Sequence, residues 1–113
     1  AWENLGLVYY DAKDFPKAQQ AFETSIELNS MSVNHWINLG QTYVAMNDIQ
    51  KAIEVMTAGL KVDPKSALLH NNLGNAFVLN QQIEAGIEEF QTALELDPQL
   101  KIAQDNLRKY KAE

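Results

Sequence analysis

The sequence contains no cysteine among its 113 residues. A disulfide framework, a thiolate zinc site and a cysteine nucleophile are therefore excluded, and the absence gives only a faint preference for a reducing compartment such as the cytoplasm. Long apolar runs are missing too: stretches such as AFVL at 76–79 fall far short of the roughly 18 to 20 residues that cross a bilayer. We expect no membrane insertion, and the localisation stays open beyond a cytoplasmic default.

Positive charge is also scarce. Nine Lys and Arg residues are outnumbered by fifteen Asp and Glu residues, which gives a net charge of −6. Because nucleic-acid binding draws much of its affinity from cations that neutralise phosphates, we expect no nucleic-acid partner. The cations Lys101, Arg108, Lys109 and Lys111 gather near the end of the chain, where they suit the C-terminus of a helix.

Glycine is present at only five positions, and three of these share one context. Asn-Leu-Gly occurs at residues 4–6, 38–40 and 72–74, at intervals of 34 residues. A glycine inside a helix costs roughly 1 kcal/mol relative to alanine, so its recurrence indicates a structural need. The same period divides the chain into four segments, 1–32, 33–66, 67–100 and 101–113.

Other residue types keep this period. In the first half of each of the first three segments, a Trp-Leu-Gly-Tyr pattern has the three- and four-residue spacing of one helical face, and a second stripe follows in the second half. Each of these three segments is therefore predicted to form two helices that pack against each other. The matching positions are Trp2, Trp36 and His70; Leu5, Leu39 and Leu73; Tyr9, Tyr43 and Phe77; Ala18, Ala52 and Gly86; Phe22, Met56 and Phe90; Ser30, Pro64 and Pro98.

The sequence also indicates where the second helices begin and end. Asp14 and Asp48 are plausible N-caps, and Asp63-Pro64 and Asp97-Pro98 predict where two of these helices end, because proline disfavours helical geometry in the residue before it. The repeated glycine is explained if it lets the two helices of a segment approach closely, with small residues opposite.

This pattern resembles the tetratricopeptide repeat family, whose 34-residue helix-turn-helix unit has a Trp, Leu-Gly, Tyr, Ala, Phe, Pro signature. The match covers essentially the whole chain, with departures such as His70 for tryptophan and Ser30 for proline. The resemblance implies an all-α fold: an α-solenoid of three helix-turn-helix repeats plus a C-terminal capping helix, about seven helices in a right-handed superhelix. Residues 1–113 would form a single domain.

The fourth segment departs from the others in a way that suits a cap. Arg108 occupies the glycine position, and an apolar stripe of Ala103, Leu107 and Tyr110 is directed back at the third repeat. At the other end, the same backward-packing positions form an apolar stripe with no preceding repeat in the sequence. We therefore expect a piece of a longer protein or a self-associating face made of Ala1, Leu5, Val8 and Ala12.

The asparagine before each Leu-Gly pair points away from the packed face of its own repeat, toward the groove that the first helices line. A primary amide can donate to and accept from a peptide backbone, although bonding to neighbouring helices or to water stays an alternative. We predict a peptide-binding groove containing Asn4, Leu7, Asn38, Gln41, Asn72, Asn75 and Asn106. Further lining positions are Tyr10, Asp11, Ile37, Val44, Leu68, Asn71, Val78 and Leu79.

The resemblance also bears on the ligand. Some family members bind the acidic tail of heat-shock chaperones through a clamp of lysine, asparagine and arginine, and the corresponding positions here are Glu3, Leu7, Asn38, Leu68 and Asn72. Only one asparagine matches and every cation is missing, so we expect no such ligand. The asparagine column is similar to the ladder in the repeat domain of O-linked N-acetylglucosamine transferases, where it holds a protein substrate's backbone.

No catalytic constellation is apparent. His35 and His70 are the only histidines, neither belongs to a metal-ligand motif, and His70 fills a tryptophan position, which predicts a packed, hydrogen-bonded residue. Trp2 and Trp36 are predicted to be core residues. We expect a non-catalytic protein-protein interaction module without a cofactor, which binds an extended peptide or a partner helix. The alternatives are the docking domain of a larger enzyme, such as a glycosyltransferase of the kind above, and a self-associating assembly scaffold.

Overall fold

The computed structural model describes residues 2–111, and every regular element in this part of the chain is an α-helix. The helices are α1 (Trp2–Asp11), α2 (Phe15–Leu28), α3 (Val33–Ala45), α4 (Ile49–Val62), α5 (Ala67–Leu79), α6 (Ile83–Leu96) and α7 (Lys101–Lys111). The all-α fold predicted from the sequence is confirmed.

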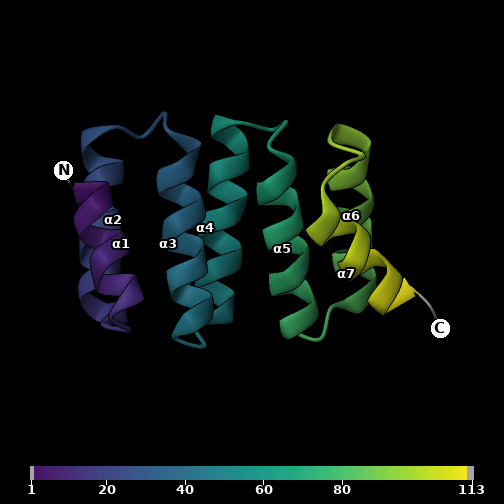
Figure 1. Ribbon diagram of the computed structural model, residues 1–113, viewed down its shortest axis with the longest axis horizontal. Helices are drawn as coiled ribbons and strands as arrows, with labels where there is room; N and C mark the ends of the chain where they lie inside the picture. Colours follow the sequence, from purple (N-terminus) through teal and green to yellow (C-terminus); the bar gives the residue numbers. More distant parts are fainter. Residues whose placement is uncertain (1, 112–113) are drawn as a thin grey trace.

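The helices form a row of hairpins in chain order, with α1 and α7 at opposite ends (Figure 1). α1 packs against α2, α3 against α4 and α5 against α6, and each second helix also contacts the first helix of the following hairpin. The row measures 42 × 25 × 21 Å. Each hairpin is therefore covered by its neighbours in the chain, which confirms the predicted α-solenoid of three repeats and a terminal helix.

The turn inside each hairpin uses one residue with positive φ. These residues are Lys13 (64°), Asn47 (62°) and Gln81 (65°), again 34 positions apart. The next residue then closes the turn, as where Asp14 N donates to Tyr9 O at 2.8 Å. Residues other than glycine and asparagine rarely adopt this backbone conformation. The hydrogen bonds that close the turn must therefore hold Lys13 and Gln81 in it.

The predicted helix ends are largely confirmed. α4 ends at Val62 and α6 at Leu96, each directly before an Asp-Pro pair. The side chain of Asp14 caps α2 by accepting a hydrogen bond from Lys17 N at 3.4 Å. Asp48 is the N-cap residue of α4, as predicted, but its side chain makes no capping hydrogen bond.

The repeated glycines lie where the two helices of a hairpin come closest. A Cβ atom on Gly6 would lie 2.5 Å from Phe22 Cε1, and one on Gly74 would lie 2.7 Å from Phe90 Cε1 and 2.9 Å from Gly86 O. The close approach is confirmed as the reason for glycine. The expectation of small residues opposite is wrong for the first two hairpins, because Phe22 and Met56 fill the space that the absent side chains of Gly6 and Gly40 leave.

A side-chain hydrogen bond holds the loop before each of α3, α5 and α7. The residue that donates it differs from one loop to the next. In every case a side-chain N–H group bonds to a backbone carbonyl six residues earlier, at positions 34 residues apart. The pairs are Trp36 Nε1 with Ser30 O (2.9 Å), His70 Nε2 with Pro64 O (2.9 Å) and Gln104 Nε2 with Pro98 O (2.7 Å).

The tryptophan position is therefore a hydrogen-bonding position as well as a packing position. His70 Nδ1 also lies 2.8 Å from Glu89 Oε1 on α6, which confirms His70 as a packed, hydrogen-bonded residue. Trp2 was predicted to be core and is not: its exposed fraction is 46%. Trp36, at the same repeat position, is half-buried and donates to Ser30 O.

A second helix also holds the first helix of the next hairpin by polar contact. Tyr43 Oη on α3 donates to Glu23 Oε2 on α2 at 3.2 Å. Burial raises the pKa of the Tyr43 hydroxyl, and the negative charge of Glu23 beside it raises this pKa further. The hydroxyl therefore stays protonated at neutral pH and keeps its role as donor.

The terminal helix α7 packs backwards onto the third hairpin, as predicted. Ala103 is fully buried, and the ring of Tyr110 stacks on Phe90 with centroids 6.1 Å apart and planes 16° apart. Arg108, in the glycine position, has a side chain 74% exposed to solvent. The helix thus covers the apolar end of the third repeat and turns charge outward.

Candidate functional site

The first helices α1, α3, α5 and α7 all contribute to a pocket of about 250 Å³. Three residues of the predicted peptide groove, Gln41, Asn72 and Asn75, come together in it. The full lining is Tyr10, Gln41, Val44, Met56, Asn72, Asn75 and Ile102, all of them uncharged. The face that these helices share, called the first-helix face below, therefore offers neutral amides between apolar and aromatic walls.

Two of these lining residues were not predicted from the sequence. Met56 belongs to α4 and is only 1% exposed, so it forms the floor of the pocket. Ile102 comes from α7 and is 50% exposed. Ile102 follows Leu68 by 34 residues, and Leu68 had been assigned to the groove, so the repeat register carried the signal that would have found it.

Two other predicted groove residues lie elsewhere on α1. Asn4 is exposed, and Leu7 is 40% exposed. Neither lines the pocket, to which α1 contributes Tyr10. Their part in binding stays a prediction.

Two predicted lining positions are corrected by their burial. Ile37 is 5% exposed and Asn71 is 1% exposed. Asn71 lies against α7, where it accepts a hydrogen bond from Asn106, and Ile37 belongs to the hydrophobic core. The prediction considered the packing of each first helix against its own second helix and left out the neighbouring first helices.

The asparagine column makes contacts between adjacent first helices. Asn38 Nδ2 donates to Glu3 Oε2 at 3.4 Å, and Asn106 Nδ2 donates to Asn71 Oδ1 at 3.0 Å. In both pairs the acceptor lies 35 residues before the donor, on the preceding first helix. Asn38 and Asn106, two of the predicted groove residues, therefore each use an amide hydrogen to connect neighbouring first helices.

Asn72 differs from these two asparagines. Its Oδ1 atom accepts a hydrogen bond from Asn71 Nδ2 at 3.4 Å. Its Nδ2 atom is buried and has no hydrogen-bond partner among residues 2–111. The residue 35 positions earlier is Ile37, which has no acceptor to offer.

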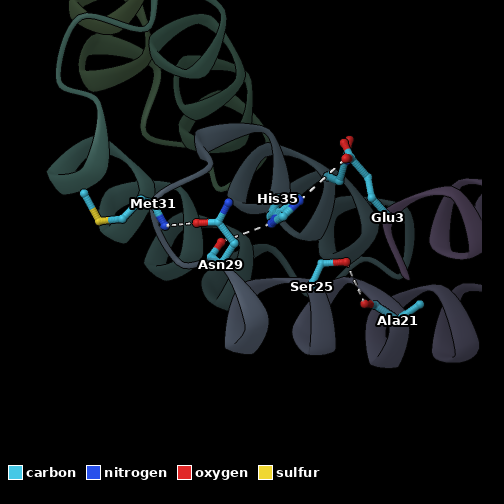
Figure 2. Close-up of polar contacts among 7 residues, drawn as sticks. Glu3, Ala21, Ser25, Asn29, Met31 and His35 are labelled. Carbon is cyan, nitrogen blue, oxygen red and sulfur yellow. Dashed lines mark hydrogen bonds and ion pairs between the residues drawn. The ribbon is translucent and has the colours of Figure 1, made fainter. Parts of the chain in front are cut away.

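The junction between the first two hairpins carries a carboxylate (Figure 2). Glu3 Oε1 lies 3.5 Å from His35 Nε2, and His35 Nδ1 lies 3.2 Å from Asn29 O. A cavity of about 200 Å³ beside it is lined by Trp2, Glu3, Ser25, Leu28, Asn29 and His35. Both oxygens of Glu3 thus face groups of α3, and a negative charge marks this end of the first-helix face.

The predicted self-associating stripe lies on the outer side of α1. Leu5 is 38% exposed, Val8 is 62% exposed and Ala12 is exposed, whereas Ala1 lies outside the described residues. A cavity of about 320 Å³ at this end is lined by Trp2, Leu5, Tyr9, Lys17, Gln20, Ala21 and Thr24. The stripe is accessible in this structure, and its use in association stays a prediction.

A cavity of about 450 Å³ lies at the opposite end, between α6 and α7, away from the first-helix face. It is lined by Leu94, Gln104, Leu107, Arg108 and Lys111. It contains none of the predicted groove residues, so we do not assign the candidate site to it.

Other chemistry has little support among the described residues. Residues 2–111 contain no group of three His, Asp or Glu side chains placed to hold a metal ion. No helix in this range combines the length and apolar character required to traverse a lipid bilayer. The chemistry that the site offers is hydrogen bonding by neutral amides together with apolar contact.

Hairpins of one repeated length, stacked in chain order and closed by a single helix, define an α-solenoid repeat protein. The family model described as tetratricopeptide repeat matches residues 37–101, and a second tetratricopeptide repeat model matches residues 1–30. The chain belongs to the tetratricopeptide repeat family. Among curated protein sequences no match is found.

Solved structures of the same fold cover almost the whole chain. The TPR domain of Arabidopsis OM64 has 22% sequence identity and a TM-score of 0.92, covering 98% of this chain and 92% of that chain. The first TPR of Spaghetti (RPAP3), bound to HSP90 peptide SRMEEVD, has 16% identity and a TM-score of 0.92, with coverages of 98% and 88%. The Yersinia enterocolitica chaperone SycD, in complex with a peptide of the translocator YopD, has 16% identity and a TM-score of 0.89, with coverages of 98% and 90%.

Proposed function

We propose that this chain is a non-catalytic protein-protein interaction module that binds an extended peptide segment along its first-helix face. The observation that carries the proposal is the uncharged pocket in which residues of α1, α3, α5 and α7 converge on the amides Gln41, Asn72 and Asn75. Two of the structurally similar domains, those of RPAP3 and SycD, were solved with bound peptides, which supports the same use of the fold here.

The size and chemistry of the pocket favour a peptide over a small cofactor. Its volume of about 250 Å³ is below the roughly 300 to 1,000 Å³ of typical small-molecule sites. Amide side chains can bond to any peptide backbone, since they both donate and accept. First helices packed about 8 to 10 Å apart would meet about every third residue of an extended strand, which rises about 3.3 to 3.6 Å per residue.

Filling the pocket should abolish binding without harming the fold. Gln41 is exposed, so a Gln41→Trp variant should fold normally while its ring occupies the space between Asn72 and Ile102. We expect its affinity for peptides selected from a random display library on the native domain to fall more than about tenfold, the effect of losing at least 1.4 kcal/mol of binding free energy. Isothermal titration calorimetry would measure this.

The matched control is Gln50→Trp, which places the same ring at an exposed position of α4, outside the pocket. Its affinity should equal that of the native protein. Equal affinity for all three proteins would show that the peptides bind elsewhere and would reject the proposal. Failure of the native domain to enrich any peptide would reject it as well.

We also propose that acidic tails are not ligands of this face. No cation stands at the positions that correspond to the clamp of related proteins, which are Glu3, Leu7, Asn38, Leu68 and Asn72. Glu3 already occupies the Asn38 donor at 3.4 Å. Adding a second carboxylate near Glu3 would cost free energy through like-charge repulsion. The peptide SRMEEVD, which was bound to the RPAP3 domain, should therefore show no saturable binding in fluorescence anisotropy up to about 1 mM, equivalent to about −4 kcal/mol. Micromolar binding would contradict this prediction.

The two other readings of the sequence, a docking domain of a larger enzyme and a self-associating scaffold, stay predictions. Both are compatible with a peptide-binding first-helix face, since neither uses the pocket residues for catalysis. The interaction module needs the fewest assumptions, because it uses only groups that the described residues present.

A further inference from the structure

The first junction between hairpins differs from the junctions that follow it. Leu69 at the second junction and Ala103 at the third have the repeat position of His35, and both are fully buried. Ile37 has the repeat position of Glu3 and is buried in the core. At the first junction, by contrast, a cavity of about 200 Å³ is lined by Glu3 and His35, whose side chains are 38% and 12% exposed. Polar residues therefore accompany an opening at this one place.

The two tryptophans show the same difference. At the second junction, a Cβ atom on Gly59 would lie 2.8 Å from Trp36 Cβ and 3.0 Å from Leu69 Cδ2, so that junction is closely packed. Ser25 has the repeat position of Gly59, and it lines the cavity of the first junction together with Trp2. The indole of Trp2 is 46% exposed. An accessible aromatic ring and a carboxylate thus border one small cavity.

The polar atoms around this cavity leave hydrogen-bond acceptors unused (Figure 2). Ser25 Oγ donates its proton to Ala21 O at 3.1 Å and keeps only its lone pairs for a ligand. His35 Nδ1 lies 3.2 Å from Asn29 O, and His35 Nε2 lies 3.5 Å from Glu3 Oε1. A neutral imidazole carries a single N–H group, so it donates to only one of these two acceptors. The first junction is consequently short of donors next to a negative charge.

We propose that this cavity binds the guanidinium group of an arginine side chain on a partner protein. Glu3 is the one carboxylate in its lining. A guanidinium is a planar fork of N–H donors that suits carboxylate and carbonyl acceptors, and its positive charge is attracted to the face of an indole such as that of Trp2. One group therefore supplies the missing donors, the missing charge and an aromatic contact.

The size of the cavity favours a single side chain over a free ligand. Its volume of about 200 Å³ lies below the roughly 300 to 1,000 Å³ of typical small-molecule sites. Leu28 also lines it and is 71% exposed, so the methylene groups of an arginine can lie along apolar surface while the charged end points inward. The net charge of −6 adds a general attraction for a cationic partner.

The arginine site is separate from the peptide pocket of the proposed function. Trp2 begins α1, Leu28 ends α2 and His35 lies in the first turn of α3, so the cavity lies at one edge of the row. It shares no lining residue with the pocket of the first-helix face. A partner can therefore be recognised at this edge whether or not the first-helix face holds a peptide.

The test uses blocked arginine, N-acetyl-arginine N-methylamide, with the uncharged citrulline analogue as its control. In ¹⁵N–¹H spectra of the native protein, the indole N–H signal of Trp2 and the amide signal of His35 should shift saturably with the arginine probe and stay in place with citrulline. Glu3→Gln should weaken binding at least about fivefold through the loss of charge-assisted hydrogen bonds. Glu27→Gln removes the same charge from an exposed position of α2 outside the cavity, and it should bind as the native protein does.

Trp2→Ala is a second variant, which leaves the contacts of Glu3 in place. It should bind the arginine probe about threefold more weakly or worse, because the cation–π contact is lost. Native affinity in both Glu3→Gln and Trp2→Ala, or equal shifts with arginine and citrulline, would overturn the inference. Tighter binding of blocked lysine would overturn the choice of a guanidinium.

Gln41→Trp separates this inference from the proposed function. That variant fills the pocket of the first-helix face, so it should bind blocked arginine as the native protein does. Loss of arginine binding in Gln41→Trp would place the cation in the peptide pocket and reject the edge site. Blocked peptide binding in Gln41→Trp together with native affinity for arginine in Glu3→Gln and Trp2→Ala would leave the proposed function standing without the arginine site.

Discussion

Replacing Gly74 with alanine should lower the free energy of unfolding by about 2 to 3 kcal/mol, the cost typical of overpacking a dense interior, although alanine is the better helix former by roughly 1 kcal/mol. The added Cβ atom would lie 2.7 Å from Phe90 Cε1 and 2.9 Å from Gly86 O. The ring can tilt, but the carbonyl oxygen belongs to the backbone of α6. The two helices of the third hairpin must therefore move apart.

Gly40→Ala is the matched comparison, at the same repeat position of the second hairpin. There the new Cβ atom would meet Met56 Cγ at 2.8 Å and Met56 Cε at 2.9 Å, both in a side chain with several torsions. We expect this variant to lose about 1 kcal/mol or less, since methionine can repack. Urea unfolding monitored by circular dichroism would measure both. Equal losses, or a stabilised Gly74→Ala, would contradict the geometric explanation.

The repeat register predicted the fold because it sampled the same contact several times. One glycine in one helix says little, whereas Gly6, Gly40 and Gly74 with partners of one kind on the second helices define a hairpin and its closest point. The loss of that glycine at Arg108 likewise predicted a helix without a following partner, and α7 packs backwards as expected. Column-by-column comparison succeeds wherever a contact lies within one repeat.

The errors concern contacts between neighbouring repeats. Asn71 and Ile37 were placed in the groove by their angle on the helix, yet Asn71 is buried against α7 and Ile37 in the hydrophobic core. The hydrogen bonds between neighbouring first helices join residues 35 positions apart in the sequence, one more than the repeat period. This offset becomes visible only when two first helices are considered together. A single helical wheel cannot show that Asn106 donates to Asn71, or that Asn72 Nδ2 has no acceptor within residues 2–111.

The position whose side chain holds the loop before each later first helix repeats a physical property and not a residue type. Trp36, His70 and Gln104 differ in size and aromaticity, although they share one repeat position. All three side chains bring an N–H group to the carbonyl six residues earlier. What the position retains is a donor at a given reach, so the physical property repeats where the residue type does not.

Phe90→Ala should have the largest effect on the third hairpin, with a loss of about 3 to 5 kcal/mol in the free energy of unfolding, the range for removing a buried phenylalanine. Phe90 is fully buried, closes over Gly74 and carries the stacked ring of Tyr110. Without it α7 loses its aromatic contact with α6. Because α7 supplies Ile102 to the pocket and Asn106 to Asn71, peptide affinity should fall as well.

Phe22→Ala is the control that separates the loss of stability from the loss of peptide affinity. Phe22 is 1% exposed, closes over Gly6 in the same way, and lies in the first hairpin, remote from α7. It should cost a similar amount of stability, since the ring removed is the same. Solenoids open locally, one repeat at a time, so hydrogen exchange should speed up in α5 to α7 for Phe90→Ala and in α1 and α2 for Phe22→Ala. Uniform acceleration in both variants would show that the row unfolds as one unit, and that α7 does not depend on Phe90 in particular.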